Sequence, residues 1–220
     1  MKKTDLAGTK PLYLFVGVLA ITAFFVPVPT RAADMKTDRA ASAADAAKFD
    51  RLTSDITQVF RQIETTGSEI AVHLQGQAGT QVNSSLQRTS DNMRAALHEL
   101  HGALESIYAS SQYNPPNAQI LPQMNMGMLR KSGEQSWNFG AIEAGSSAMR
   151  SYQARLAALT DEVQTARGDF GVHRDRAVTR LIETLQSLAQ LNHLIGDAAQ
   201  AMQRNEQCVA GMFSGDTKCK

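Results

Sequence analysis

Large apolar residues return every three or four positions along four stretches of this chain, and this spacing limits what the chain can fold into. Residues three and four apart lie on one face of an α-helix, so each stretch predicts a helix with one apolar stripe and a broad polar remainder. Such a helix is not stable alone in water and has to pack its stripe against another helix. We therefore predict an all-α fold, an elongated bundle of three to four long amphipathic helices.

The first three stripes consist mainly of aliphatic and aromatic residues. They are Phe49, Leu52, Ile56, Val59, Ile63, Ile70 and Leu74; Val82, Leu86, Met93, Leu97, Leu100, Leu104 and Ile107; and Met149, Tyr152, Leu156, Leu159, Val163, Ala166 and Phe170. The fourth stretch has a seven-residue repeat, with Leu181, Leu188, Ile195 and Met202 at one position and Val178, Leu185, Asn192 and Ala199 at the other. This repeat predicts a coiled-coil seam. Asn192 either fixes the register of the seam or faces another polar group.

Glycines separate the predicted helices. Gly76 and Gly79 predict a bend or break between the first two helices, because glycine in a helix interior costs roughly 1 kcal/mol. Gly168 and Gly171 separate the third helix from the fourth, and so short a connection predicts an antiparallel pair. Residues 34–47 are mostly alanine and charged residues, which either fray or extend the first helix. Helices of about 25 to 35 residues would give a rod of about 40 to 50 Å.

The amino-terminal region predicts export. Three lysines precede an uncharged apolar run from Pro11 to Pro29, which ends in Thr30-Arg31-Ala32-Ala33, as in a secretory signal peptide cut after Ala32 or Ala33. A retained anchor is the alternative, since the run approaches the roughly 20 residues that span a bilayer. We expect a signal peptide at 1–32, a helical bundle at 33–207 and a tail at 208–220. The mature chain would not span a membrane and would lie in the periplasm or at the cell surface.

The charge balance favours no nucleic-acid partner. Residues 1–32 hold four of the 22 basic and one of the 21 acidic side chains, which leaves 18 basic and 20 acidic ones. Nucleic acids and anionic membranes require a concentrated basic patch, and the mature chain has a net charge of about −2. We expect neither as a partner.

The segment 111–140 differs from the rest of the chain, because it combines prolines and glycines with the only tryptophan. A long insert in a compact domain is usually functional or mobile. Its apolar residues either form a contact surface or fold back and cap the bundle. The candidate interaction surface consists of Tyr113, Ile120, Leu121, Met124, Met126, Met128, Trp137 and Phe139.

Cys208 and Cys219 are the only cysteines, and both are expected after the final helix. An exported chain meets an oxidising compartment, so the two predict a disulfide. Free thiols or a bond between two chains are the alternatives. Neither cysteine lies in a Cys-x-x-Cys motif, so redox catalysis and covalent haem have no support.

The sequence predicts no metal, cofactor or catalytic site. Met124, Met126 and Met128 are soft ligands of the kind that select Cu(I), but methionine also fills contact surfaces. His98 and His101 lie three apart on one helix, although no further zinc or di-iron ligands accompany them.

Haem and enzyme signatures are also missing from the sequence. His193 lies next to the predicted seam, but no second axial haem ligand is identifiable. No Gly-x-Ser-x-Gly motif, phosphate-binding loop or paired carboxylates occur in a framework that would form a pocket, so we do not expect an enzyme.

The order of export signal, long helix, loop-rich middle and closing helical pair resembles the minor pilus subunit family of bacterial type IV secretion and conjugal transfer systems. Residues 148–167, AMRSYQARLAALTDEVQTAR, and 175–204, DRAVTRLIETLQSLAQLNHLIGDAAQAMQR, are similar to the final helical hairpin of that family. The resemblance implies a pilus-associated protein without cofactors that aids pilus assembly and cell contact. Its partners would be other secretion-system or pilus subunits, or further copies of itself.

Two other functions are compatible with the sequence. One is a periplasmic binding module for Cu(I) or a small hydrophobic ligand, in which Met124, Met126 and Met128 form the site. The other is a helical chaperone that binds unfolded proteins through the central segment.

Overall fold

The computed structural model describes residues 34–74, 76–111, 113 and 138–214. This part of the chain folds into long α-helices and contains no strand. The helices are α1 (Asp34–His73), α2 (Gly76–Ser111), α3 (Phe139–Thr165) and α4 (His173–Ser214). The predicted all-α, elongated helical bundle is confirmed.

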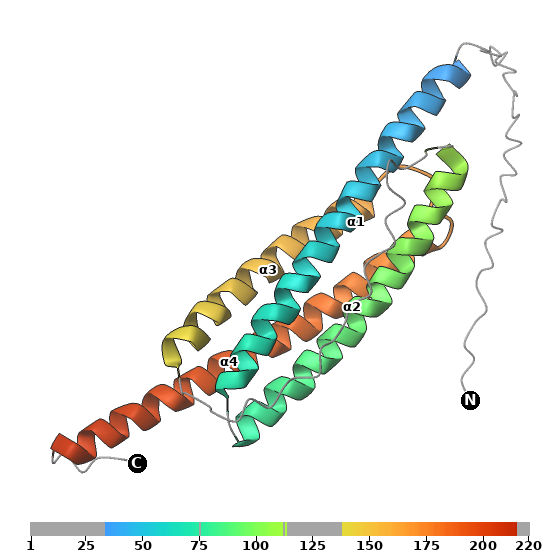
Figure 1. The fold of residues 1–220 in the computed structure, drawn as a ribbon. Helices are drawn as coiled ribbons and strands as arrows, with labels where there is room; N and C mark the ends of the chain where they lie inside the picture. The colour runs from blue at the N-terminus through green and yellow to red at the C-terminus, as the bar shows by residue number, and fades with distance from the viewer. Residues whose placement is uncertain (1–33, 75, 112, 114–137, 215–220) are drawn as a thin grey trace, which may run out of the picture.

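The four helices form a bundle in the spatial order α1, α2, α4, α3 (Figure 1). Each helix packs mainly against two others, and the most extensive contact joins α2 to α4 rather than two helices connected by a short turn. All four neighbouring pairs are antiparallel. Across α2 and α4, for example, Asn92 contacts Ser187 whereas Gly102, ten residues further on, faces His173.

This arrangement makes α2 and α3 run in the same direction. The end of α2 therefore lies at one end of the bundle and the start of α3 at the other (Figure 1). Ile107 faces Gly168, beyond the end of α3, whereas Gly145 near the start of α3 faces Ile70. The chain between the two helices has to connect opposite ends of the bundle, which gives a physical reason for its length.

The predicted turns are confirmed, except that Gly79 lies inside α2 and not in the break. Gly76 (φ 64°) separates α1 from α2, and Gly168 (φ 142°) and Gly171 (φ 55°) lie between α3 and α4. These backbone angles are readily adopted only by glycine. Asn138 starts α3 by accepting a hydrogen bond from the backbone N–H of Ala141, at 3.1 Å between Oδ1 and N. All six prolines lie outside the four helices.

The core follows the predicted stripes along α1 and α2, whereas Tyr152 of α3 and Ala166 just after it are only partly buried and α4 departs further. Leu181, Leu188, Ile195 and Met202 are buried as predicted. At the second seam position, however, Leu185, Asn192 and Ala199 are only partly buried. The fully or nearly fully buried residues there are instead Ala177, Thr184, Leu191 and Ala198. The register differs because α4 packs against both α2 and α3, so its buried face is wider than a two-helix seam.

Phe170 is a second correction, because it lies in the α3–α4 connection and not on α3. Its side chain is nevertheless buried and packs on Phe49 of α1, with 4.5 Å between the ring centroids. The guanidinium of Arg174 lies 5.6 Å from the centre of the same ring. Phe170 therefore covers the end of the core where α3 turns into α4.

The buried threonine hydroxyl groups are satisfied within their own helices, whereas the buried Ser90 hydroxyl of α2 donates to Oε1 of Glu64 on α1 at 2.9 Å. Thr53, Thr57, Thr89, Thr160 and Thr184 each donate a hydrogen bond to the carbonyl four residues earlier. The core therefore accepts threonine without a polar network between helices.

Two helices are longer than expected. α1 has 40 residues and includes 34–47, and α4 has 42, so each rises about 60 Å. α4 contains Cys208, which was expected after the last helix. No helix in the described ranges is long and apolar enough to cross a membrane. The predicted signal peptide at 1–32 lies outside these ranges.

Candidate functional site

Most of the predicted interaction surface lies outside the described residues. This applies to Ile120, Leu121, Met124, Met126, Met128 and Trp137. Tyr113 and Phe139 are described, and both side chains are half-buried. They follow α2 and begin α3, so the structure places them at opposite ends of the bundle rather than in one surface.

Tyr113 packs against Tyr108 at the end of α2, with 5.5 Å between ring centroids. Burial of Tyr108, together with its interaction with the Asp50 carboxylate of α1, raises the pKa of this phenol above its usual value. The phenol stays neutral at physiological pH and acts as a hydrogen-bond donor. Tyr113, two positions beyond Ser111, therefore continues the packing past the end of α2.

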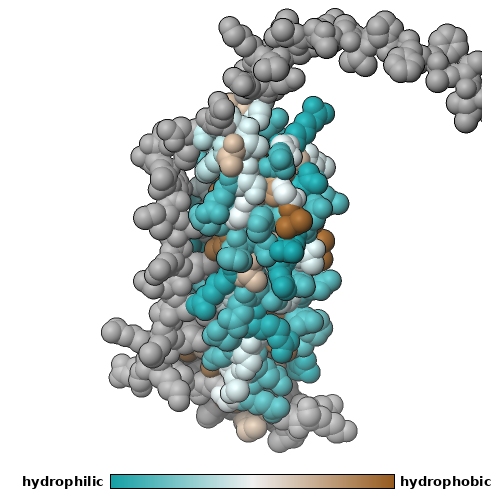
Figure 2. Space-filling model, turned by 90° about the vertical axis from the view of Figure 1, so that its right-hand side faces the viewer, coloured by the Kyte–Doolittle hydropathy of each residue, from teal (hydrophilic) through white to brown (hydrophobic). Residues whose placement is uncertain are grey.

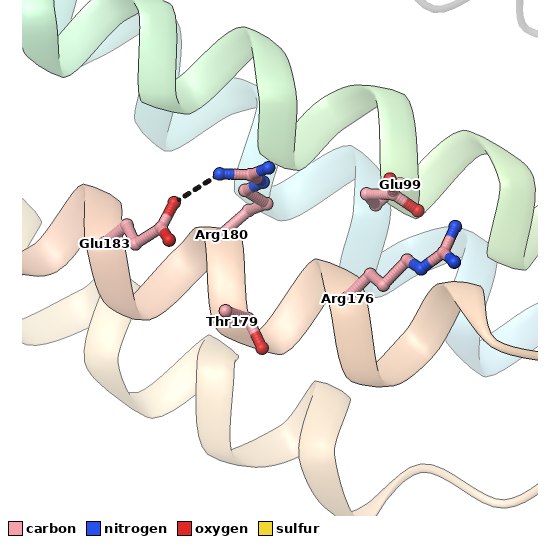
Figure 3. Close-up of a pocket in the computed structure, with 5 residues that line it drawn as sticks. All are labelled: Glu99, Arg176, Thr179, Arg180 and Glu183. Atoms are coloured by element: carbon pink, nitrogen blue, oxygen red, sulfur yellow. Dashed lines mark hydrogen bonds and ion pairs between the residues drawn. The ribbon is translucent and has the colours of Figure 1, made fainter.

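The described part of the chain forms an open, charged groove of about 350 Å³ between α2 and α4 (Figure 3). The residues lining it are Glu99, Arg176, Thr179, Arg180 and Glu183. The four α4 residues lie on one face because they are three and four positions apart. We refer to this feature as the α2–α4 groove.

The side chain of Glu99 is 17% exposed, less than those of Arg180 (48%) and Glu183 (40%) in the same groove. Its Oε2 lies 2.9 Å from Nδ1 of His173, the first residue of α4. The hydrogen bond to His173, helped by the charge of Arg176, holds the pKa of Glu99 below its usual value against the opposing effect of burial. Glu99 therefore links α2 to the start of α4 in its ionised form.

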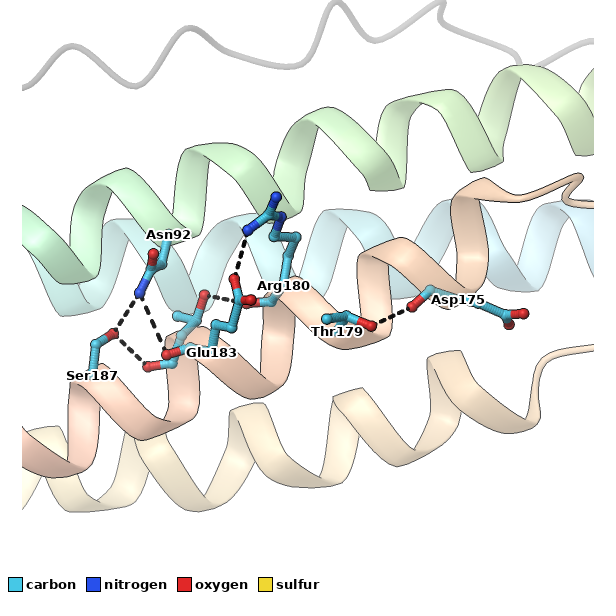
Figure 4. A network of polar contacts seen from close by, with 7 residues as sticks. Asn92, Asp175, Thr179, Arg180, Glu183 and Ser187 are labelled. Carbon is cyan, nitrogen blue, oxygen red and sulfur yellow. Dashed lines mark hydrogen bonds and ion pairs between the residues drawn. The ribbon is translucent and has the colours of Figure 1, made fainter.

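A polar network continues along the same face (Figure 4). Asn92 of α2 donates to the Glu183 carbonyl at 3.4 Å and to the Ser187 hydroxyl at 3.2 Å. Arg180 pairs with the Glu183 carboxylate at 2.8 Å, and Thr179 donates to the Asp175 carbonyl. The Thr179 hydroxyl, which lines the groove, is thus held by a backbone carbonyl of its own helix. The arrangement suits polar contact with another molecule.

The Glu99–His173 pair leads to a prediction about pH. The folded-state pKa of Glu99 is depressed, so its contribution to stability is present above the unfolded-state value and is lost as pH falls through the folded-state value. Glu99→Gln should lower the Tm at pH 6 by about 2–4 °C and by less at pH 3. Circular-dichroism melts at both pH values check this. An equal loss at both would show that the carboxylate charge is not responsible.

The histidines that could have served as metal ligands do not converge. His98 is exposed, His101 pairs with Glu105 at 3.0 Å, and His193 pairs with Asp197 at 2.9 Å on the solvent side of α4. In the described ranges, no three His, Cys, Asp or Glu side chains are grouped as a metal site. Asn192 donates to Gln153 of α3 at 2.7 Å, so the expectation that it faces another polar group is confirmed.

One side of the molecule is mostly hydrophilic, with only scattered apolar residues (Figure 2). Four large hydrophobic side chains are exposed in the described part of the chain: Val172, Ile182, Val209 and Met212. Val209 and Met212 lie near the end of α4, where this helix projects beyond the other three (Figure 1).

Sequence reasoning missed most of the groove. The predicted interaction surface contained none of the residues that line the groove. The signal available was the three- and four-residue spacing of Arg176, Arg180 and Glu183, which places them on one helix face. The spacing says nothing about α2, so the groove follows only from the packing of α2 on α4.

The predicted disulfide is not tested by this structure, because Cys219 lies outside the described residues. We predict that Cys208 and Cys219 are bonded to each other. Denatured, unreduced protein should then give no reaction with a thiol reagent and a mass two daltons below that of the reduced protein. Two reactive thiols in freshly exported protein would contradict this.

Comparison with known proteins gives a match to part of the chain. No family model and no solved structure matches the chain. The chain is 37% identical over 82 residues to the ESAT-6-like protein EsxB of Mycolicibacterium smegmatis. The match covers 82% of that protein and 37% of this chain.

This similarity overturns the functional assignment drawn from the resemblance. The assignment to a minor pilus subunit of a type IV secretion or conjugation system is wrong, as are the pilus and conjugation roles that it implied. The copper-binding and chaperone alternatives also receive no support. The error has a physical cause: any bundle of long antiparallel helices buries stripes with the same three- and four-residue spacing, so periodicity cannot separate such families. The matched residues, which extend over four-fifths of the relative, show that this chain belongs to the family of ESAT-6-like proteins.

Proposed function

We propose that the chain is a secreted, non-enzymatic protein of a type VII secretion system that acts by binding other proteins of that system. The observation that carries the proposal is the similarity to an ESAT-6-like protein over 82 residues. Similarity to such a relative supports export and contact with other proteins as the role of this chain.

The helical surface supports the same role. The apolar stripes are used in the bundle core, so contacts with another protein have to use polar faces or the projecting ends of helices. The α2–α4 groove offers two arginines and two glutamates, and the end of α4 offers exposed Val209 and Met212. The groove and the exposed end of α4 lie about 40 Å apart along this helix, so each would be a separate contact site.

Export can be tested by producing the tagged chain in M. smegmatis and in a strain whose type VII secretion is inactivated. We expect the protein in the culture filtrate of the first strain only, with a cytosolic marker absent from both filtrates. Equal amounts in both filtrates would reject the type VII route.

The predicted signal peptide provides the matched control. A variant that lacks residues 2–32 should still be exported by the first strain if the helical part carries the export information. The protein would be assigned to general secretion instead if two results were found together. The truncated variant would not be exported, and the inactivated strain would still export the full chain.

A further inference from the structure

The relative is short enough to limit how many helical hairpins it can hold. The 82 matched residues are 82% of EsxB, so that protein has about 100 residues in all. In this chain, α1 with α2 occupies 34–111, and α3 with α4 occupies 139–214. A protein of the relative's length has room for one such helical hairpin, whereas this chain has two.

We infer that this chain is a pair of helical hairpins joined covalently. A single hairpin would need a second protein to cover its apolar face, and here the other hairpin of the same chain covers it. Hairpin A is α1 with α2, and hairpin B is α3 with α4. The inference rests on the helix packing and on the relative's length, and it does not depend on the proposed route of export.

The contacts between the hairpins are the larger part of the packing. The α2–α4 contact, which joins hairpin A to hairpin B, is more extensive than the contact within either hairpin. The α1–α3 contact also joins the two hairpins and is about as extensive as the α3–α4 contact within hairpin B. Two helices alone form a single layer that leaves its apolar face in water, and the second hairpin removes that face from solvent.

Specific features of the interface show close packing along both seams. On one seam, a Cβ added to Gly102 of α2 would lie 2.6 Å from the His173 ring of α4. On the other, a Cβ added to Gly145 of α3 would lie 2.6 Å from Cγ1 of Ile70 in α1. At each of these glycines a side chain of the other hairpin occupies the space that a Cβ would take, so the two surfaces are closely packed.

Polar contacts also cross both seams. Glu99 binds His173 and Asn92 binds Ser187 between α2 and α4, and Arg155 lies 3.6 Å from Asp55 between α3 and α1. The first two are partly buried, so each is costly to leave without its partner. They favour this pairing of hairpins over a looser hydrophobic association.

The connection between the hairpins is long enough for both to belong to one molecule. It joins opposite ends of the bundle, and α3, the shorter helix, rises about 40 Å. Residues 112–138 reach further than this, because an extended chain spans up to about 3.3–3.6 Å per residue. A tether of this kind gives the second hairpin an effective concentration on the order of millimolar.

The test uses the full chain with a specific protease site inserted within 112–138. Before cutting, we expect a particle with the mass of one chain, 23.9 kDa with the leader, and a Tm independent of concentration. After cutting, the two halves should stay together as one particle whose Tm rises with concentration. Separation of the halves on cutting, or an uncut chain that is a dimer, would overturn the inference.

A pair of variants distinguishes the interface from general stability. Gly145→Leu places a side chain against Ile70 across the interface, whereas Gly196 of α4 has nothing within 4 Å of an added Cβ. In the cut protein, Gly145→Leu should raise the dissociation constant of the two halves at least tenfold, and Gly196→Leu should leave it unchanged. Equal effects of both variants would argue against the assigned interface. Should Gly145→Leu not fold, the cut and uncut protein without substitutions still decides the question.

A last measurement tests whether the face is covered. Purified EsxB of M. smegmatis, added in tenfold excess, should not bind the uncut chain in size-exclusion chromatography. A stable complex of EsxB with the uncut chain would show that a hairpin-binding face remains open, and would overturn the inference.

Discussion

Replacing Phe49 with alanine should lower the free energy of unfolding by about 3–5 kcal/mol, the usual cost of losing a buried phenylalanine. The side chain is 1% exposed and its ring packs on Phe170, so the substitution removes a large buried surface from two elements at once. This loss is a large part of the total stability of a typical domain. We expect the Tm to fall by about 10 °C or more in a thermal melt followed by circular dichroism.

The control for Phe49 is Ile182→Ala, which removes a large apolar side chain that is 44% exposed on α4. Its effect should stay within about 0.5 kcal/mol. If Phe49→Ala were as mild as this control, the contact between α1 and the α3–α4 connection would not support the core.

Gly79→Ala should give the second largest effect. A Cβ at this position would lie 2.5 Å from the carbonyl oxygen of Leu74 and 3.0 Å from its carbonyl carbon. Backbone atoms cannot rotate away as a side-chain end can, so the α1–α2 turn has to shift. We expect a loss of about 1–3 kcal/mol in the free energy of unfolding, measured by urea titration.

Gly196→Ala is the matched control for this change, because both glycines lie in helices and an added Cβ at 196 has open space. Alanine should stabilise the protein there by about 0.5–1 kcal/mol, through its better helix propensity. If Gly79→Ala lowers the free energy of unfolding and Gly196→Ala raises it, the loss at position 79 comes from the close contact with Leu74. A gain in stability at both positions would contradict the geometry of the turn.

The candidate site was much less predictable than the fold. The predicted surface centred on 111–140, but its described members, Tyr113 and Phe139, lie at opposite ends of the bundle. The α2–α4 groove brings Glu99 beside Arg176, residues that are far apart in the sequence. No local pattern can predict such a neighbour, because it depends on which helices pack together.

The amino-acid sequence alone determined that the chain is helical, where the apolar stripes lie, and that glycines at 76, 168 and 171 interrupt the helices. These features are local, because the 3.6-residue period and the backbone freedom of glycine act over a few residues. The tertiary structure decided that α4 buries Thr184 and Leu191 in place of Leu185 and Asn192, since α4 has to cover two helices at once. It also decided that α3 runs parallel to α2, so that two hairpins cover each other's apolar faces within one chain. Helix direction and pairing depend on contacts between residues far apart in the sequence, and a short window of sequence does not contain them.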